Sequence, residues 1–384
     1  MKTNNTINVL YGGIKVGTLA LTGNRKTAFE YSDEWLETGF AISPFALPLE
    51  KKVFVAQKDY FKGLHGVFAD SLPDAWGQLL LERILKSKGY NLDEINVLDR
   101  LAIVGSSGMG ALTYEPETNI VQGQVTEDLD ELADSCWKIM NTEYSDRLDD
   151  LYQLGGTIGG ARPKIMTEID GESWIIKFPA HIDGRDIGKM EYEYSLCAGK
   201  CGIDMAETRL FPSKKCSGYF GTKRFDREYV NGKMKKIHML TAAAILEIDF
   251  EQPSLDYHSL MKLTKIITRD NEHDVKNMYK RMCFNVYAHN RDDHSNNFSF
   301  LYKEEEKNWR LSPAYDLTYS NTYYGEHTTT VDGNGKNPGL KELVAVGMQA
   351  GLSKEWCTKE AMKVEELVYE TFNDYNYYNV NHRL

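Results

Sequence analysis

The stretch NRDDHSNNFSFLY, residues 290–302, places acidic, imidazole and amide side chains directly before an apolar run. Asp292, His294 and Asn297 stand close together within it. A positioned carboxylate can accept the proton of a reacting hydroxyl, and carboxylate and amide oxygens are ligands that Mg²⁺ prefers. Three interpretations compete: a phosphoryl-transfer site, a metal site of another kind, and a polar turn without chemistry.

The segment LGGTIGGARPKIMTEIDGESWIIKFPA, residues 154–180, predicts a glycine loop followed by two strands that meet at an Asp-Gly turn. Glycines let a backbone approach a ligand closely and direct its N–H groups toward an anion. The loop contains Gly155, Gly156, Gly159 and Gly160. Lys164 opens the first strand, and Lys177 stands among apolar residues on the second, where an ammonium group is costly without an anion. The segment therefore predicts a phosphate-binding site.

The chain order of these residues is the order in which protein kinases hold ATP and transfer its terminal phosphoryl group. The strand lysine is followed by a predicted helix that carries Glu191 and Glu193. Asp292 then precedes Asn297 by the spacing that separates the catalytic aspartate of a kinase from its metal-binding asparagine. Asp316 follows a predicted strand, where a kinase needs its second metal-binding acid.

A metallohydrolase is the main alternative, since a cluster of acids and histidines could bind a divalent ion. Its ligands would come from His289, Asp292, Asp293, His294 and His327. Such a site has no need for the glycine loop and its lysines. A polar turn without chemistry leaves all the distant residues unexplained, so the pattern favours a kinase.

The composition is typical of a globular protein with two or three subdomains. The chain has 384 residues, 42% of them hydrophobic, and a net charge of −11. This charge argues against nucleic-acid binding through the overall field. The six cysteines form no CxxC pair and predict scattered, reduced thiols. The N-terminus lacks a signal-peptide pattern and no segment reaches the ~20 apolar residues of a membrane helix, so we expect a cytoplasmic protein.

The pattern of elements predicts a mixed α/β (α+β) protein. TINVLYGGIKVGTLAL is typical of two strands around a turn, SLPDAWGQLLLERILKSKGY of a helix, and GSSGMGAL of a tight turn before a strand. The acidic segment ETNIVQGQVTEDLDELADS predicts a boundary. We expect an N-terminal α/β subdomain over 1–125, a lobe with the glycine loop over 126–235, and a mostly helical lobe over 236–384.

Several short segments make the sequence similar to the HipA family, the serine/threonine kinase toxins of bacterial toxin–antitoxin pairs. They occur in the family's order over most of the chain: FADSLPDAWG, GGTIGGARPK, WIIKFP, YEYSL, KRFDRE, DDHSNNFS and PAYDLT. The resemblance implies a protein-kinase-like core of two lobes, with ATP between them, and an additional N-terminal subdomain.

The resemblance also assigns residues to an ATP site. They are Gly156, Thr157, Ile158, Gly159, Lys164, Lys177, Arg224, Phe225, Asp226, His294, Asn297 and Asp316. Asp292 would be the catalytic aspartate, while Asn297 and Asp316 would hold Mg²⁺. Lys177 would contact the ATP phosphates, and His294 would shape the catalytic loop.

The remaining assignments concern the base, the sugar and regulation. Arg224 and Phe225 would line the adenine, and Asp226 would lie near the ribose. HipA-type kinases are regulated by autophosphorylation in the glycine loop, and Thr157 occupies that position here. The family usually has serine there; threonine carries the same nucleophile but is stiffer at χ1.

The sequence thus predicts an ATP- and Mg²⁺-dependent serine/threonine protein kinase. By resemblance, its partner is a HipB-like helix-turn-helix antitoxin, through which it meets DNA only indirectly, and its substrate is a protein, with the translation machinery as the expected source. We expect no membrane association. Two alternatives stay open: a nucleotide-binding regulator without turnover, and a small-molecule phosphotransferase, since antibiotic phosphotransferases use a similar Asp-x-His-x-x-Asn loop.

Overall fold

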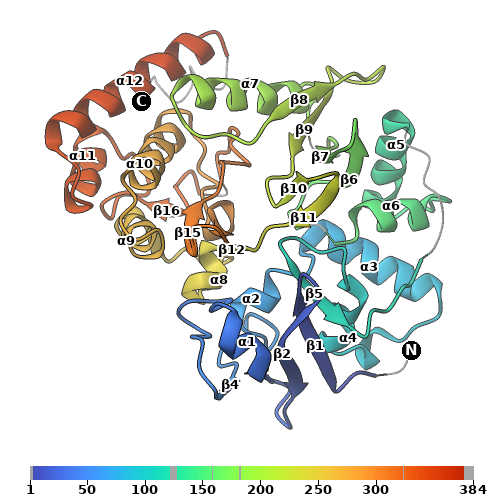
Figure 1. Ribbon diagram of the computed structural model, residues 1–384. Helices are drawn as coiled ribbons and strands as arrows, with labels where there is room; N and C mark the ends of the chain where they lie inside the picture. Colours follow the sequence, from blue (N-terminus) through green and yellow to red (C-terminus); the bar gives the residue numbers. More distant parts are fainter. Residues whose placement is uncertain (1–2, 122–127, 158, 181–182, 323, 376–384) are drawn as a thin grey trace. The chain divides into compact units, whose positions relative to one another are not determined.

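The computed structural model describes most of the chain, which Figure 1 shows as a ribbon. The described residues are 3–121, 128–157, 159–180, 183–322 and 324–375. They divide into two compact units. Unit 1 is drawn from Met1–Lys189, Arg209–Leu240 and Ala244–Glu247, and unit 2 from Met190–Thr208, Thr241–Ala243 and Ile248–Leu384.

Unit 1 begins with an antiparallel sheet in the order β4-β3-β2-β1-β5. Its strands are β1 (Thr6–Tyr11), β2 (Ile14–Leu21), β3 (Thr27–Tyr31), β4 (Val53–Val55) and β5 (Leu112–Glu115). The predicted turn between β1 and β2 is confirmed. Gly12 and Gly13 there have φ of 56° and 85°, the left-handed backbone that glycine adopts at the least cost.

Four α-helices and a 3-10 turn accompany this sheet. They are α1 (Asp33–Thr38), α2 (Gly66–Ala69), α3 (Ala75–Ser87), η1 (Leu92–Glu94) and α4 (Val97–Val104). The helix predicted from helical apolar spacing is α3, which buries Trp76, Leu80 and Ile84. The glycine-rich segment after α4 forms the expected turn, and β5 follows it.

The second sheet of unit 1 has the order β6-β7-β9-β8. Its strands are β6 (Lys164–Ile169), β7 (Glu172–Lys177), β8 (Thr208–Phe211) and β9 (Tyr219–Lys223), and α5 (Leu129–Met140) and α6 (Leu148–Gly155) precede them. The β6–β7 turn is the predicted Asp-Gly turn, with φ of 55° at Asp170 and 76° at Gly171. A small hairpin of β10 (Arg227–Val230) and β11 (Lys233–Lys236) follows.

One hydrophobic core joins the N-terminal helices to this second sheet. It contains Trp76 and Leu80 of α3, Leu151 of α6, and Trp174 and Ile176 of β7. Because α3 packs into the same core as β7, residues 1–125 and much of 126–235 fall into one compact unit. The division of the chain into three parts stays a prediction.

Unit 2 is mostly helical. Most of α7 (Ile187–Lys200) belongs to it, with α9 (Tyr257–Ile267), α10 (Glu272–Tyr287), α11 (Leu340–Gln349) and α12 (Lys354–Phe372). Short strands complete it: β13 (Leu255–Asp256), β14 (Ser299–Lys303), β15 (Asn308–Leu311) and β16 (Thr329–Thr330), and the 3-10 turn η2 (Ser295–Asn297). The chain passes from one unit to the other within β12 (Met239–Thr241) and again within α8 (Ala242–Leu246).

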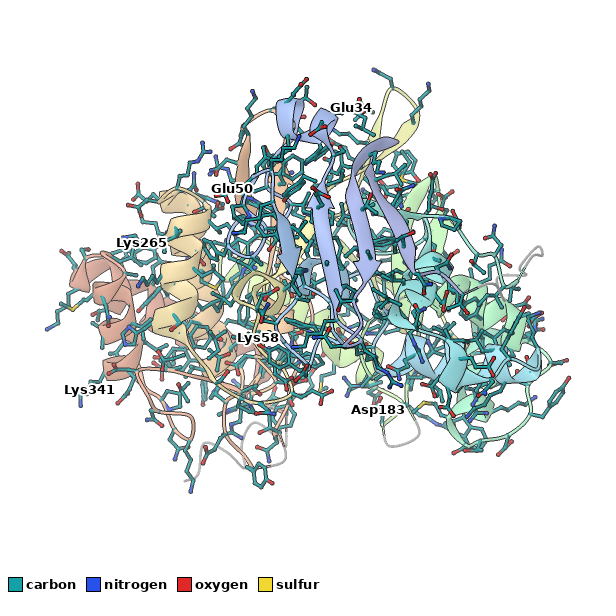
Figure 2. The ribbon with its side chains drawn as sticks, turned by 90° about the horizontal axis from the view of Figure 1, so that it is seen from below. Glu34, Glu50, Lys58, Asp183, Lys265 and Lys341 are labelled. Carbon is teal, nitrogen blue, oxygen red and sulfur yellow. The ribbon has the colours of Figure 1, made fainter. Side chains whose placement is uncertain are left out.

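Helix α10 forms the centre of unit 2 and packs against α9, α11 and α12. Tyr194 of α7 stacks on Phe372 with ring centroids 4.3 Å apart, and its hydroxyl donates to the carbonyl of Ala288 at 2.9 Å. Lys265 of α9, labelled in Figure 2, donates to the carbonyl of Ala350 at the end of α11. The hydrogen bond from Tyr194 thus holds Ala288 at the end of α10, just before the polar stretch at 290–302.

Among the residues that the structure describes, no helix combines the length and the apolar character that crossing a membrane requires. All six cysteines are free thiols, and Cys216 alone is only half-buried. The cytoplasmic location stays a prediction.

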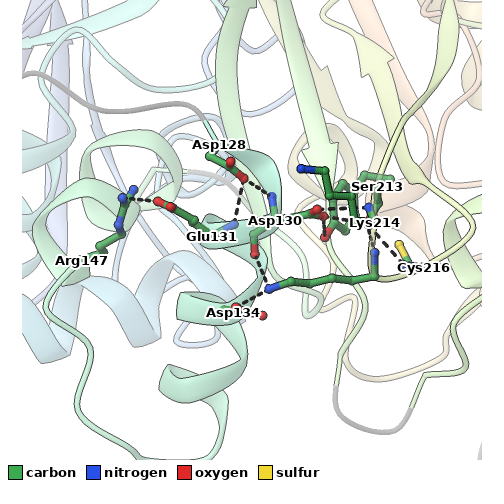
Figure 3. Close-up of polar contacts among 10 residues, drawn as sticks. Asp128, Asp130, Glu131, Asp134, Arg147, Ser213, Lys214 and Cys216 are labelled. Carbon is green, nitrogen blue, oxygen red and sulfur yellow. Dashed lines mark hydrogen bonds and ion pairs between the residues drawn. The ribbon is translucent and has the colours of Figure 1, made fainter.

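Asp130 connects α5 to the turn that follows β8 (Figure 3). Its carboxylate accepts hydrogen bonds from Ser213 Oγ at 2.6 Å, Lys214 N at 3.1 Å and Tyr219 OH at 2.8 Å. The bond from Ser213 is the main cause that lowers the pKa of Asp130, while partial burial opposes it.

Asp130→Asn is expected to lower the free energy of unfolding by about 1 kcal/mol at pH 7, the net contribution of a hydrogen bond. Because the folded-state pKa is lowered, the contribution of the carboxylate is present above its unfolded-state pKa of about 3.9 and is lost as the pH falls through the folded-state value. Chemical denaturation at pH 7 and at pH 3 measures the difference, which should be smaller at pH 3.

Asp134→Asn is the matched control for this change. Asp134 lies one turn further along α5, is 58% exposed and pairs with Lys215. Exposed ion pairs contribute about 0–1 kcal/mol, so the control should remain close to the wild type. An Asp130→Asn protein as stable as the wild type at pH 7 would contradict the role of Asp130.

Candidate active site

The glycine loop begins at the end of α6. Gly155 is the last residue of that helix and Gly156 is its C-cap, with φ of −68°. A Cβ atom on Gly155 would lie 2.6 Å from the carbonyl oxygen of Lys164, and one on Gly156 would overlap the ring of Tyr152. Close packing therefore requires these two glycines, and their approach to a ligand stays a prediction. Ile158 lies outside the described residues.

The N-terminus of α3 holds the rest of the loop. Asp74 accepts a hydrogen bond from the backbone N–H of Gly160, and Trp76 N donates to the carbonyl of Gly160 at 3.1 Å. Trp76 Nε1 donates to the carbonyl of Lys164 at 3.0 Å. Sequence reasoning did not single out Asp74 and Trp76, although both belong to the FADSLPDAWG segment.

Two lysines lie on the sheet just beyond the loop. Lys164 and Lys177 are cross-strand partners in the β6–β7 register, so their side chains share one face of the sheet. Lys164 is only 6% exposed, and a Cβ atom added to Gly160 would overlap its ammonium group. The ammonium of Lys177 lies 5.6 Å from the centroid of the Phe220 ring. The fold thus places two cations on one face of the sheet beside the loop, and their binding of phosphates stays a prediction.

An ion pair between Arg162 and Asp183 follows the glycine loop in the chain. Arg162 Nε lies 3.0 Å from Asp183 Oδ2, and the same oxygen accepts a hydrogen bond from the backbone N–H of Ala180 at 2.8 Å. Figure 2 labels Asp183. This pair anchors the chain on both sides of the β6–β7 hairpin.

Asp226 is fully buried between two arginines. Arg224 donates to it through Nε at 2.9 Å and Nη2 at 2.8 Å, and Arg227 Nη1 donates at 2.8 Å. The backbone N–H of Gly110 donates as well, at 2.8 Å. Burial raises the pKa of Asp226, but Arg224 and Arg227 outweigh it, so the pKa lies below its ordinary value.

Asp226 has no exposed surface with which to contact a ligand directly, and its place near a ribose stays a prediction. Through Arg227, which donates to the carbonyls of Gly108 and Gly110, it fixes the glycine-rich turn after α4. Thr157 Oγ1 lies 3.4 Å from the carbonyl of Ser107 in that same turn. The placement of Arg224 and Phe225 beside an adenine stays a prediction.

In unit 2, the stretch after α10 forms a compact loop. The side chain of Asp292 is 57% exposed, and its Oδ1 lies 3.8 Å from Nε2 of His294. Asn297, at the end of η2, donates from its amide nitrogen to the carbonyl of Asp292 at 2.7 Å. The structure therefore brings the three predicted residues of the loop together, with the Asp292 carboxylate available to a reactant.

Asp316 is tied to the same loop by its neighbour. The hydroxyl of Tyr315 donates to the carbonyl of Asn296 at 2.6 Å and lies 2.5 Å from Ser299 Oγ. Asp316 itself has φ of 55°, a strained conformation for a residue with a side chain, which costs on the order of 1 kcal/mol. Carboxylate and amide oxygens from Asp316 and Asn297 suit Mg²⁺.

Other residues predicted as ligands of a metallohydrolase site have different surroundings. Asp293 and His327 are buried and contact each other, with Nδ1 of His327 3.0 Å from Oδ2 of Asp293. Within the described residues, no group of three or more His, Cys, Asp and Glu side chains is arranged to hold a metal ion. The sequence could not distinguish the buried Asp293 from the exposed Asp292 beside it.

The two glutamates of α7 also differ in their surroundings. Glu191 is buried, with 3% exposure. Glu193 accepts a hydrogen bond from the hydroxyl of Tyr375. A functional role for either glutamate stays a prediction.

Comparisons with known proteins agree on one family. The HipA-like C-terminal domain matches residues 156–372, more than half of the chain, and the HipA N-terminal domain matches residues 7–115. The protein named "Putative kinase Y4mE" of Sinorhizobium fredii is 24% identical over 372 residues, which cover 89% of this chain and 84% of that protein.

Among solved structures, the chain is similar to one in the complex of HipA, HipB and operator DNA from the Shewanella oneidensis MR-1 toxin–antitoxin system. The TM-score is 0.70 at 16% identity, with 95% of this chain and 90% of that chain covered. This likeness confirms the mixed α/β, HipA-like fold predicted from the sequence. With both family domains matched in order, the chain belongs to the HipA family.

Proposed function

We propose that this protein is an ATP- and Mg²⁺-dependent serine/threonine kinase of the HipA toxin type. The observation that carries the proposal is the loop of unit 2, where Asn297 binds the backbone of Asp292 and Tyr315 ties Asp316 to the same turn. These are the residue types that phosphoryl transfer requires for proton acceptance and metal binding. The family membership and the similarity to a protein named as a kinase support it.

In this mechanism each group of residues has its own task. The loop N–H groups, Lys164 and Lys177 bind the phosphates and offset their charge. Asn297 and Asp316 would hold Mg²⁺, which would supply positive charge to offset that of the phosphate oxygens. Asp292 accepts the proton of the attacking hydroxyl. The oxygen of that hydroxyl bonds to the γ-phosphorus, and the bond from this phosphorus to the bridging oxygen of ADP breaks.

The partners proposed follow from the family. A HipB-like helix-turn-helix antitoxin would bind this chain, which would meet DNA through that antitoxin, and the phosphorylated substrate would be a protein. The acidic net charge of −11 suits contact with a basic partner better than direct contact with DNA.

Mass spectrometry of the chain after incubation with Mg-ATP tests this function. A phosphate on Thr157 supports a self-regulated protein kinase. Thermal stabilisation by ATP without any transfer supports the nucleotide-binding regulator instead. Transfer to small hydroxyl compounds, with none to any protein, supports the small-molecule phosphotransferase.

Gly160→Ala is expected to weaken Mg-ATP binding on the order of ten-fold or more, since a hydrogen bond to a charged group contributes about 1.5–3 kcal/mol. The new Cβ would overlap the ammonium of Lys164 and displace it. The backbone at Gly160 also has φ of 97°, so the variant should lose some stability as well. Calorimetric titration with Mg-ATP measures the Kd.

Gly171→Ala is the matched control, which introduces backbone strain without displacing Lys164. Gly171 has φ of 76°, and a Cβ there meets nothing within 4 Å. This variant should lose stability through the same backbone strain but bind Mg-ATP like the wild type. Equal Kd values for the two variants would remove Lys164 from the proposed site.

A further inference from the structure

A buried carboxylate lies directly beside the proposed catalytic one. Asp293 is 0% exposed, whereas the side chain of Asp292 is 57% exposed. The two consecutive side chains therefore lie in opposite environments, one accessible to a reactant and the other inside unit 2. Nothing in the proposed phosphoryl-transfer chemistry uses Asp293.

The carboxylate of Asp293 makes three polar contacts. Oδ2 accepts a hydrogen bond from the hydroxyl of Tyr257 at 2.9 Å and lies 3.0 Å from Nδ1 of His327. Oδ1 accepts from the backbone N–H of Thr329 at 3.1 Å. Burial raises the pKa of Tyr257 well above its ordinary value, so this phenol keeps its proton and acts as a donor.

These contacts continue into α10. Asn285 Nδ2 donates to the hydroxyl of Tyr257 at 2.9 Å, and Asn290 Nδ2 donates to Asn285 Oδ1 at 3.0 Å. Tyr257, Asn285 and Asn290 are all at most 2% exposed. The network therefore links α9 and α10 to the first residue of the catalytic stretch. A buried network whose members are all satisfied fixes one arrangement of the backbone.

Asp293 also joins the catalytic loop to the segment around β16. The hydroxyl of Thr329 donates to the backbone carbonyl of Asp293 at 2.5 Å, and the N–H of Thr328 donates to the carbonyl of Arg291 at 3.0 Å. The backbone on both sides of Asp292 is thus held by Thr328 and Thr329. That segment follows Asp316 in the chain.

We propose that Asp293 is a positioning residue for phosphoryl transfer, which through Tyr257, His327 and Thr329 fixes the direction in which the carboxylate of Asp292 points. This inference rests on the proposed function. Asp293 does not touch the reactants.

Asp293→Asn tests the inference because it keeps the shape of the side chain and removes its charge. The expected result is a kcat reduced roughly 10- to 100-fold, the order of effect of a displacement near 1 Å, with the KM for ATP changed by less than about three-fold. The assay follows conversion of Mg-ATP to ADP and the phosphate incorporated into the chain itself. A merely structural role would reduce the folded fraction and leave kcat per folded molecule unchanged.

Asp99→Asn is the matched control. Asp99 is 1% exposed and accepts hydrogen bonds from Asn4 and Asn96, in unit 1. It should lose stability with kcat unchanged. If Asp293→Asn does not fold, Thr329→Val and Tyr257→Phe each remove one contact of Asp293 and should still reduce kcat several-fold.

The outcomes separate this inference from the function on which it rests. A wild-type protein that transfers no phosphate overturns the proposed kinase and the positioning role together. An active wild type whose folded Asp293→Asn, Thr329→Val and Tyr257→Phe variants keep its kcat overturns the positioning role alone. A kcat that falls in these variants and not in Asp99→Asn supports it.

Discussion

Asp292→Asn is expected to slow phosphoryl transfer on the order of 10²–10⁴-fold, the contribution of a positioned proton acceptor. The amide keeps the size of the side chain but cannot take the proton of the attacking hydroxyl. Binding of Mg-ATP should be largely retained, because the lysines and the metal ligands are unchanged. The rate of ADP formation and the Kd for Mg-ATP, measured on the same preparation, give both quantities.

Asp270→Asn is the control for this change. Asp270 lies in unit 2, its side chain is 70% exposed, and it pairs with Lys265 at 3.4 Å. The same exchange of an exposed carboxylate for an amide should leave transfer unchanged. An Asp292→Asn protein that transfers phosphate at the wild-type rate would remove Asp292 from the catalytic role.

Asp226→Asn is expected to have the largest effect on stability, a loss of about 3–5 kcal/mol in the free energy of unfolding. The substitution leaves Arg224 and Arg227 buried without the carboxylate that they share. The turn at Gly108–Gly110, held through Arg227 and Asp226, should loosen as well. Denaturant titration at pH 7 measures the loss.

The effect of Asp226 should depend on pH with a definite sign. Its folded-state pKa is lowered, so the stabilisation is complete above the unfolded-state value of about 3.9 and disappears as the pH falls through the folded-state value. The gap between wild type and variant should therefore narrow below about pH 4. Glu228→Gln, two residues further along, is exposed and should stay within about 0.5 kcal/mol of the wild type. A constant gap from pH 7 to pH 3 would count against the carboxylate as the source.

Local sequence patterns were sufficient to predict the structure where neighbouring residues in the chain determine it. The Gly12-Gly13 and Asp170-Gly171 turns adopt the left-handed backbone that their residue types favour. Helix α3 follows from its apolar spacing. The close grouping of Asp292 and Asn297 follows from their separation along one short loop.

Local sequence patterns were insufficient to predict the structure where contacts with distant residues determine it. The glycine pattern did not predict that Gly155 packs against the carbonyl of Lys164 on β6, which leaves no room for a side chain. Asp226 pairs with its chain neighbours Arg224 and Arg227, but the backbone N–H of Gly110, which also donates to it, lies 116 residues away.

The sequence by itself determined the family, the order of the candidate site residues and the class of chemistry that they suit, since these depend on residue type and spacing. Only the tertiary structure decided which of two adjacent aspartates meets solvent and which is enclosed. Tyr257 and Thr329, the partners of Asp293, each lie 36 residues away along the chain. Burial depends on such distant packing, and the residues next to the two aspartates in the chain do not determine it.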